Sequence, residues 1–238
     1  MTALHLSRAR LRSHRGEALS AIAPILIPDD PSSRTTHAHR LVWLLFQDQA
    51  DATRDFLWRD DGAGRYLVLS HRPPADPHGL FELESKPFEP ALAAGDRLSF
   101  ALRANPVTTT KRAGSKPGKA GRSRGKRVDV VMDALFKLPP GQRAVERDKA
   151  AAEAGQVWLE AQGGRAGFKL TAAPVIKGYE QINLADPSRG RRARASLSVL
   201  DLEGTIEIID PAAFVAKLGQ GFGAGKAFGN GLMLIRRA

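Results

Sequence analysis

Histidine is the residue type in this chain best suited to moving protons near neutral pH, because an unperturbed imidazole titrates there. A single histidine is more often structural or simply exposed than catalytic, so residue type alone selects none of the six. His37 and His39 lie two residues apart on an expected helix, so they face different sides and would chelate a metal ion poorly. The six histidines are His5, His14, His37, His39, His71 and His78.

Other reactive side chains are scarce. The chain has no cysteine, which excludes disulfides, thiolate metal sites and cysteine nucleophiles. Two carboxylate pairs, Asp29-Asp30 and Asp60-Asp61, stand beside prolines and in a glycine-rich turn, where aspartate is favoured for conformational reasons. No carboxylate cluster of the two-metal type remains, so the sequence predicts chemistry that uses no metal ion and no other cofactor.

A glycine-rich segment near the C-terminus, residues 219–234, has five glycines among residues 221–231. It is not a P-loop, because Gln220 stands where that motif begins with glycine and Ala227 where it has Ser or Thr. Glycines let a backbone approach phosphate closely, whereas a tight packing turn between a helix and a strand is the alternative. The candidate phosphate-binding residues in this segment are Gly221, Gly223, Lys226 and Gly229.

The net charge of +11 has its excess in two short segments. Residues 111–127 hold eight Lys or Arg and no acid, and residues 189–194 hold four more Arg. Without these twelve, 24 basic residues face 25 acidic ones. Charge concentrated in this way favours a polyanionic partner such as nucleic acid, although a solubilising loop is the alternative for either segment alone.

The elements that must position these residues form two similar α+β units. Residues 3–11 alternate as a half-buried strand, a helix capped by Ser32 or Ser33 is expected through Phe46, and residues 56–69 form a β-hairpin before a strand near 80–90. This order is that of a ferredoxin-like unit whose second helix is weak or missing.

The pattern restarts after residue 95. We expect a strand at 98–107, the basic loop, helices near 128–138 and 143–162, and strands near 168–184 and 194–209. Pro211 begins a short helix, and a last strand spans 232–236.

Four segments resemble one known family. The pattern G-x-G-x-x-K-x-x-G-x-G-L from Gly221 closely resembles the C-terminal loop of the CasE family, the repeat-processing endoribonucleases of type I-E CRISPR systems. Residues 102–107, Leu-Arg-Ala-Asn-Pro-Val, look like the family's L-R-A-N-P motif, residues 39–58 resemble the segment after its active-site histidine, and residues 202–204 match a late strand.

This resemblance implies two tandem ferredoxin-like (RRM-like) domains, here residues 1–90 and 97–238. It also implies binding to the stem-loop of CRISPR repeat RNA and cleavage at the base of the stem. Such cleavage needs no metal, because the RNA's own 2′-hydroxyl is the nucleophile and the enzyme orients it, moves protons and stabilises charge.

The catalytic residue implied by the resemblance is His39. The family often has a tyrosine three residues earlier, where this chain has Thr36, whose hydroxyl cannot replace a phenol as an acid. His37 is a candidate to compensate. Arg40 is a candidate phosphate clamp, and an exposed helix arginine is the alternative.

The two basic segments predict different contacts with RNA. Residues 189–194 lie between two expected strands, and in the family a hairpin in this region engages the RNA stem, where arginines can bind guanine in a bidentate manner. Residues 111–127 are expected to add affinity rather than sequence choice. The candidates are Arg189, Arg191, Arg192 and Arg194 in the first segment, and Lys116, Lys119, Arg122 and Arg124 in the second.

Two alternatives remain from the sequence. A non-catalytic RNA-hairpin-binding subunit of a ribonucleoprotein complex would share the charge, the fold and the glycine segment, and an unrelated ribosome-associated protein would share the charge. The resemblance implies other Cascade subunits as partners. No apolar stretch reaches transmembrane length and the first residues lack a signal core, so we expect a cytoplasmic protein.

Overall fold

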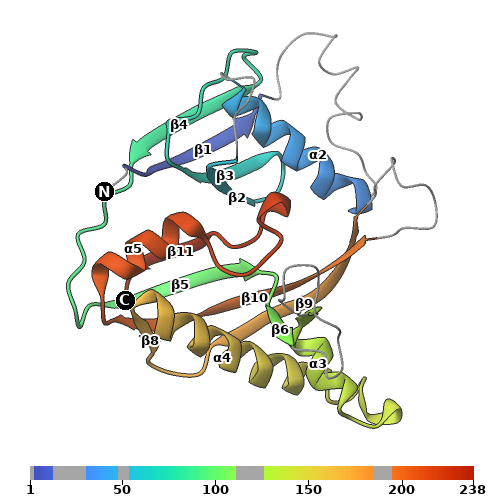
Figure 1. Cartoon of the computed structure of the whole chain (residues 1–238). Coiled ribbons are helices and arrows are strands. Elements are labelled where there is room, and N and C mark those ends of the chain that lie inside the picture. The colour runs from blue at the N-terminus through green and yellow to red at the C-terminus, as the bar shows by residue number, and fades with distance from the viewer. Residues whose placement is uncertain (1–2, 13–30, 48–53, 111–125, 185–194) are drawn as a thin grey trace, which may run out of the picture.

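The computed structural model describes residues 3–12, 31–47, 54–110, 126–184 and 195–238, and these ranges form two antiparallel sheets with helices on their faces (Figure 1). The described part of the chain contains no helix long and apolar enough to cross a membrane.

The first sheet has the strand order of a ferredoxin-like domain, β2-β3-β1-β4, with every neighbouring pair antiparallel. Helix α2 follows β1 in the chain, and no second helix occurs in the described residues between β3 and β4. The expected weak or missing helix is therefore confirmed as missing. The elements are β1 His5–Leu11, α2 Pro31–Trp43, the 3₁₀ turn η1 Leu44–Phe46, β2 Phe56–Asp60, β3 Arg65–Ser70 and β4 Phe81–Pro87.

Alternating side chains explain how α2 packs on this sheet. On β2, Phe56 and Trp58 face the helix, whereas Leu57 faces the other way and joins a separate apolar cluster. The expected apolar face of the helix is confirmed, since all four of its predicted residues are buried: Leu41, Val42, Leu45 and Phe46. The N-cap prediction is wrong, because the helix begins at Pro31 and both Ser32 and Ser33 lie inside its first turn.

The second sheet repeats the arrangement with the order β11-β5-β10-β8, and β9 pairs with the other part of the long strand β10. Helices α4 and α5 connect its strands as the two helices of a ferredoxin-like domain do. The elements are β5 Arg97–Ala104, β6 Val107–Thr110, β7 Lys126–Asp129, α3 Val130–Phe136, η2 Pro140–Gln142, α4 Arg147–Ala166, β8 Phe168–Leu170, β9 Val175–Leu184, β10 Ala195–Ile208, α5 Pro211–Gln220, η4 Lys226–Phe228 and β11 Met233–Arg237.

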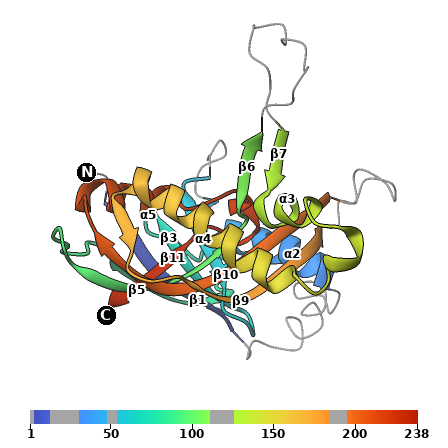
Figure 2. The same cartoon turned by 90° about the horizontal axis from the view of Figure 1, so that it is seen from below.

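The basic segment from residue 111 is carried on a two-stranded ribbon. β6 and β7 pair antiparallel from Val107–Asp129 to Thr110–Lys126, and the ribbon projects from the body (Figure 2). The prediction of one strand over 98–107 and a helix from 128 is therefore corrected: Asn105 and Pro106 separate β5 from β6, and Asp129 caps α3 by accepting a hydrogen bond from the Met132 amide at 2.7 Å. The expected hairpin around 189–194 is supported by the pairing of β9 with β10, while its tip lies outside the described residues.

The two domains pack through the face of the first sheet that α2 leaves uncovered. Leu57 and Leu69 of that face share an apolar cluster with Leu232, and Val215 of α5 packs against it. In Figure 1 the loop between α5 and β11 lies between the two sheets and reaches β2 and α2. The glycine-rich segment therefore forms the junction between the domains.

Candidate active site

His39 lies on α2 at the domain junction, half-buried between an aromatic residue of its own helix and one of the glycine-rich loop. Its ring centroid is 6.0 Å from that of Trp43, one turn later on α2, and 6.3 Å from that of Phe228 in η4. Because Trp43 belongs to the first domain and Phe228 to the second, packing of the domains is what encloses the imidazole.

The pKa of His39 is lowered from its ordinary value, first by burial and then by the positive charges of Arg54 and Arg40. All three causes disfavour the imidazolium ion. The neutral ring therefore predominates at neutral pH, and a neutral imidazole can accept a proton.

A hollow of 610 Å³ opens beside this ring. Its walls combine the aliphatic and aromatic surface of α2 and η1 with two guanidinium groups and no carboxylate. The lining residues are His39, Arg40, Trp43, Leu44, Gln47, Arg54 and Ala227. This combination suits a phosphodiester whose sugar or base packs on the apolar wall.

The glycine-rich loop is held in one shape by hydrogen bonds from both domains. Within the loop, the buried Asn230 donates from Nδ2 to the carbonyl oxygens of Gly225 and Phe228 at 3.3 and 3.1 Å. From the first domain, the indole of Trp58 donates to the carbonyl of Ala227 at 3.3 Å. These bonds fix the short η4 turn that carries Lys226.

The Leu-Arg-Ala-Asn-Pro motif forms the other anchor of the loop. The carbonyl of Asn105 accepts the Ala224 amide at 3.1 Å, and the carbonyl of Arg103 accepts the Gly231 amide at 2.7 Å. The Asn105 side chain is itself fixed, because its Nδ2 donates to the Ser198 carbonyl at 2.6 Å. Two motifs about 120 residues apart thus act as one structural unit.

The glycines of the loop are required by contacts inside the protein. Gly221, Gly223 and Gly229 all have positive φ, between 72° and 75°. A β-carbon would lie 2.5 Å from the Asn105 carbonyl oxygen at Gly223, 2.8 Å from Leu57 at Gly221 and 3.1 Å from the Trp58 ring at Gly229. The structure thus gives these glycines a packing role, which was the alternative interpretation of the segment.

Lys226 and Arg54 bring further positive charge to the junction. The pKa of Lys226 is lowered by burial and then by the charges of Lys217 and Arg54. Burial also lowers the pKa of Arg54, which lines the hollow beside His39. Cations that are partly desolvated and close to one another form a favourable site for an anion.

The predicted site residues divide into three groups. His39, Arg40 and Lys226 lie at the junction. Thr36 and His37 are half-buried on α2 and do not line the hollow beside the imidazole. The third group lies outside the described residues: Lys116, Lys119, Arg122, Arg124, Arg189, Arg191, Arg192 and Arg194.

Arg54 is the site residue that the sequence analysis missed. It stands two residues before β2 begins, in a segment whose pattern predicts only the start of a strand. Only the return of the C-terminal loop to that strand places it near both His39 and Lys226. No group of three or more histidine or acidic side chains in the described residues is placed to hold a metal ion.

Comparisons with known proteins agree on one family. A family model described as "CRISPR associated protein" matches residues 4–237. A CRISPR-associated endoribonuclease, Cse3 of Thermus thermophilus, is 32% identical over 157 residues, which are 63% of this chain and 60% of that protein. The CRISPR system Cascade subunit CasE of Escherichia coli is 26% identical over 202 residues, covering 83% of this chain and 89% of the subunit.

Solved structures agree on the fold. Cse3 bound to a 19-nucleotide RNA superposes with a TM-score of 0.64 at 23% identity, over 98% of this chain and 99% of the other. The CRISPR-associated protein Cas6e of Escherichia coli superposes with a TM-score of 0.59 at 20% identity, over 98% and 100%. Together with the two strand orders, these likenesses confirm two tandem ferredoxin-like domains.

Proposed function

The chain belongs to the family of CRISPR-associated proteins, and we propose that it is the endoribonuclease of a type I-E system, which binds the stem-loop of CRISPR repeat RNA and cuts at the base of the stem. One observation carries the activity: the half-buried His39 and the cations Arg54 and Lys226 converge where the two domains meet. The two domains are residues 1–90 and 97–238, divided at the segment between β4 and β5.

His39 acts as the base. Its neutral imidazole takes the proton of the 2′-hydroxyl, the 2′-oxygen forms a bond to phosphorus, and the bond from phosphorus to the 5′-oxygen breaks. Arg54 and Lys226 stabilise the negative charge that grows on the phosphoryl oxygens. The 5′-oxygen leaves with a proton from the solvent, so the products end in a 2′,3′-cyclic phosphate and a 5′-hydroxyl. Arg40, at the rim of the hollow, holds an adjacent phosphate.

The basic segments hold the RNA stem. Each joins two strands that pair antiparallel, one β6 to β7 and the other β9 to β10. Solved assemblies titled "CRISPR RNA-guided surveillance complex" contain a chain with this fold, and we propose that the present chain likewise keeps its cut RNA and joins other Cascade subunits.

Incubation with a repeat-hairpin RNA in EDTA tests the proposal. We expect one cut at the base of the stem, at the same rate with and without the chelator, and a 2′,3′-cyclic phosphate or 3′-phosphate end by mass spectrometry. A protein that binds the hairpin tightly without cutting it would instead be a non-catalytic RNA-binding subunit.

A further inference from the structure

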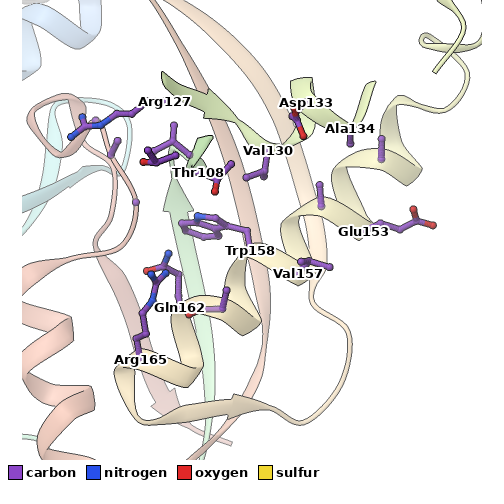
Figure 3. A pocket seen from close by; sticks show the side chains of 18 of the residues that line it. Thr108, Arg127, Val130, Asp133, Ala134, Glu153, Val157, Trp158, Gln162 and Arg165 are labelled. Atoms are coloured by element: carbon purple, nitrogen blue, oxygen red, sulfur yellow. Dashed lines mark hydrogen bonds between the residues drawn. The ribbon is translucent and has the colours of Figure 1, made fainter. Parts of the chain in front are cut away.

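A groove of 1430 Å³ runs from the glycine-rich loop along α4 and α3, on the side of the loop where the β6–β7 ribbon rises. Figure 3 shows its wall, with Trp158 and Gln162 of α4 facing Thr108 and Arg127 of the ribbon. The groove and the hollow beside His39 share one residue, Arg54. The groove and the proposed site of cleavage therefore lie against the same arginine, so they are neighbours.

The charges along the groove are not evenly distributed. The acids that line the groove lie on α3, in the segment between α3 and α4, and on α4: Asp133, Glu146 and Glu153. Two of them have basic partners: Asp133 lies 2.8 Å from Lys137, and Glu146 lies 4.0 Å from Lys149. Toward the glycine-rich loop the lining charges are all positive. These are Arg54, Arg127, Arg165, Lys217 and Lys226.

Four of these cations form a connected row. The pKa of Lys217 is lowered by burial and by the charge of Arg165, and that of Lys226 by burial and by the charges of Lys217 and Arg54. The row thus runs Arg165, Lys217, Lys226, Arg54. Neighbouring cations that burial also desolvates repel one another, and a chain of phosphates along the groove would remove that cost.

Apolar surface lies beside the row. Val157 on α4 is 65% exposed and lines the groove, whereas the neighbouring Trp158, which also lines it, is only 5% exposed and forms part of the core beneath. A single-stranded RNA matches both features of the groove: its evenly charged backbone suits the cations, and the apolar faces of its bases suit the apolar surface. A duplex instead keeps its bases stacked inside and offers no apolar face to such a wall.

We propose that this groove binds the single-stranded flank of the repeat RNA next to the cut bond, with its phosphates along Arg165 and Lys217 and its bases toward the exposed Val157. This proposal rests on the proposed function and adds a second binding site to it. In this arrangement the basic segments bind the hairpin, and the flank runs from Arg54 along the groove.

The test compares three RNAs that cannot be cut because they carry a 2′-deoxy sugar at the cleavage position: the hairpin alone, the hairpin with a short 3′ flank, and the hairpin with a short 5′ flank. In the wild type we expect one flank to tighten binding roughly ten-fold, as two or three phosphate contacts would. The flank that does so identifies the strand that occupies the groove.

The variant Arg165→Gln with Lys217→Gln should abolish this gain and leave the affinity for the bare hairpin within about two-fold, since neither residue lines the hollow at His39. Lys217→Gln also removes the ammonium that lies over the Phe222 ring, 5.3 Å from its centroid. A melting curve checks folding, and Arg165→Gln alone, on an exposed helix position, is the milder variant. Lys86→Gln, exposed on β4, is the matched control.

The proposal is overturned if neither flank tightens binding in the wild type, or if the double variant weakens the bare hairpin as much as the flanked one. Cleavage of the unmodified hairpin in EDTA is measured in parallel. The hairpin for that reaction keeps a single nucleotide beyond the cut bond, so that the bond exists but no longer flank is present. Failure of this reaction would count against the proposed function, whereas a missing flank effect with normal cleavage would count against the groove alone.

Discussion

The two hollows at the domain junction differ in what forms them. The hollow beside His39 is small and has an apolar wall from α2 and η1. Of the residues that line the two cavities, His39 is the one histidine. The groove along α4 is more than twice as large and is lined by a row of cations without a histidine. Arg54 alone lines both.

This difference indicates that the hollow serves the chemical step and the groove serves RNA affinity. A neutral imidazole contributes little to holding a polyanion, while lysines and arginines that neutralise phosphates contribute binding that depends on salt. The glycine-rich loop lies between the two hollows, with Phe228 against His39 and Lys226 in the groove. Substitutions in the hollow beside His39 should therefore affect the cleavage rate, and substitutions in the groove should affect RNA affinity. Substitutions in the glycine-rich loop should affect both.

Replacement of His39 should have the largest effect, and on rate alone. His39→Ala is expected to slow single-turnover cleavage by about 10²- to 10⁴-fold, the usual contribution of a positioned general base. Hairpin affinity should stay near the wild-type value. His37→Ala is the matched control and should retain most of the rate, because His37 does not line the hollow. Wild-type cleavage by His39→Ala would refute the assigned role.

A change in the loop should affect both properties through folding. Gly223→Ala places a β-carbon 2.5 Å from the Asn105 carbonyl oxygen at a residue with φ of +72°. We expect the free energy of unfolding to fall by about 1–3 kcal/mol, which in a chain of this size lowers Tm by roughly 2–12 °C. Gly141→Ala, where a β-carbon meets no atom within 4 Å, is the control for scanning calorimetry. Equal melting of the two variants would show that the loop tolerates a side chain.

Much of the fold follows from local sequence signals. The alternation of β1, the turn between β2 and β3 and the proline that begins α5 each depend on neighbouring residues, and each is confirmed. The β6–β7 ribbon was missed because Asn105-Pro106 interrupts a continuous apolar pattern and the residues between its strands are polar. His39 and Lys226 could be proposed from motifs, although their positions relative to one another come from the family resemblance and from domain packing.

A packing role for the glycines was one of two interpretations of the sequence, but the residues against which they pack, and the role of Arg54, could not be predicted from it. Both depend on contacts between segments more than a hundred residues apart, such as Gly223 with Asn105 and Arg54 with Lys226. Spacing within one element carries no information on such contacts, whereas strand and helix periodicity is visible within a few residues.

Replacement of Arg54 should lower the rate, because Arg54 stabilises the phosphoryl charge, and it should also give the smallest effect that still tests the comparison, a shift in pH dependence. Arg54 lowers the pKa of His39, so Arg54→Gln should raise that pKa toward its ordinary value. If His39 works as a base, the rate rises with pH as the imidazole loses its proton, and the acidic limb of the single-turnover profile then moves to higher pH. Arg40→Gln should move it in the same direction by less, because Arg40 is the smaller of the two charge effects. Gln47→Ala changes the same hollow without changing its charge and should leave the limb in place. A limb that moves to lower pH in Arg54→Gln, or does not move, would mean that Arg54 acts only in the groove and that the two hollows are electrostatically independent.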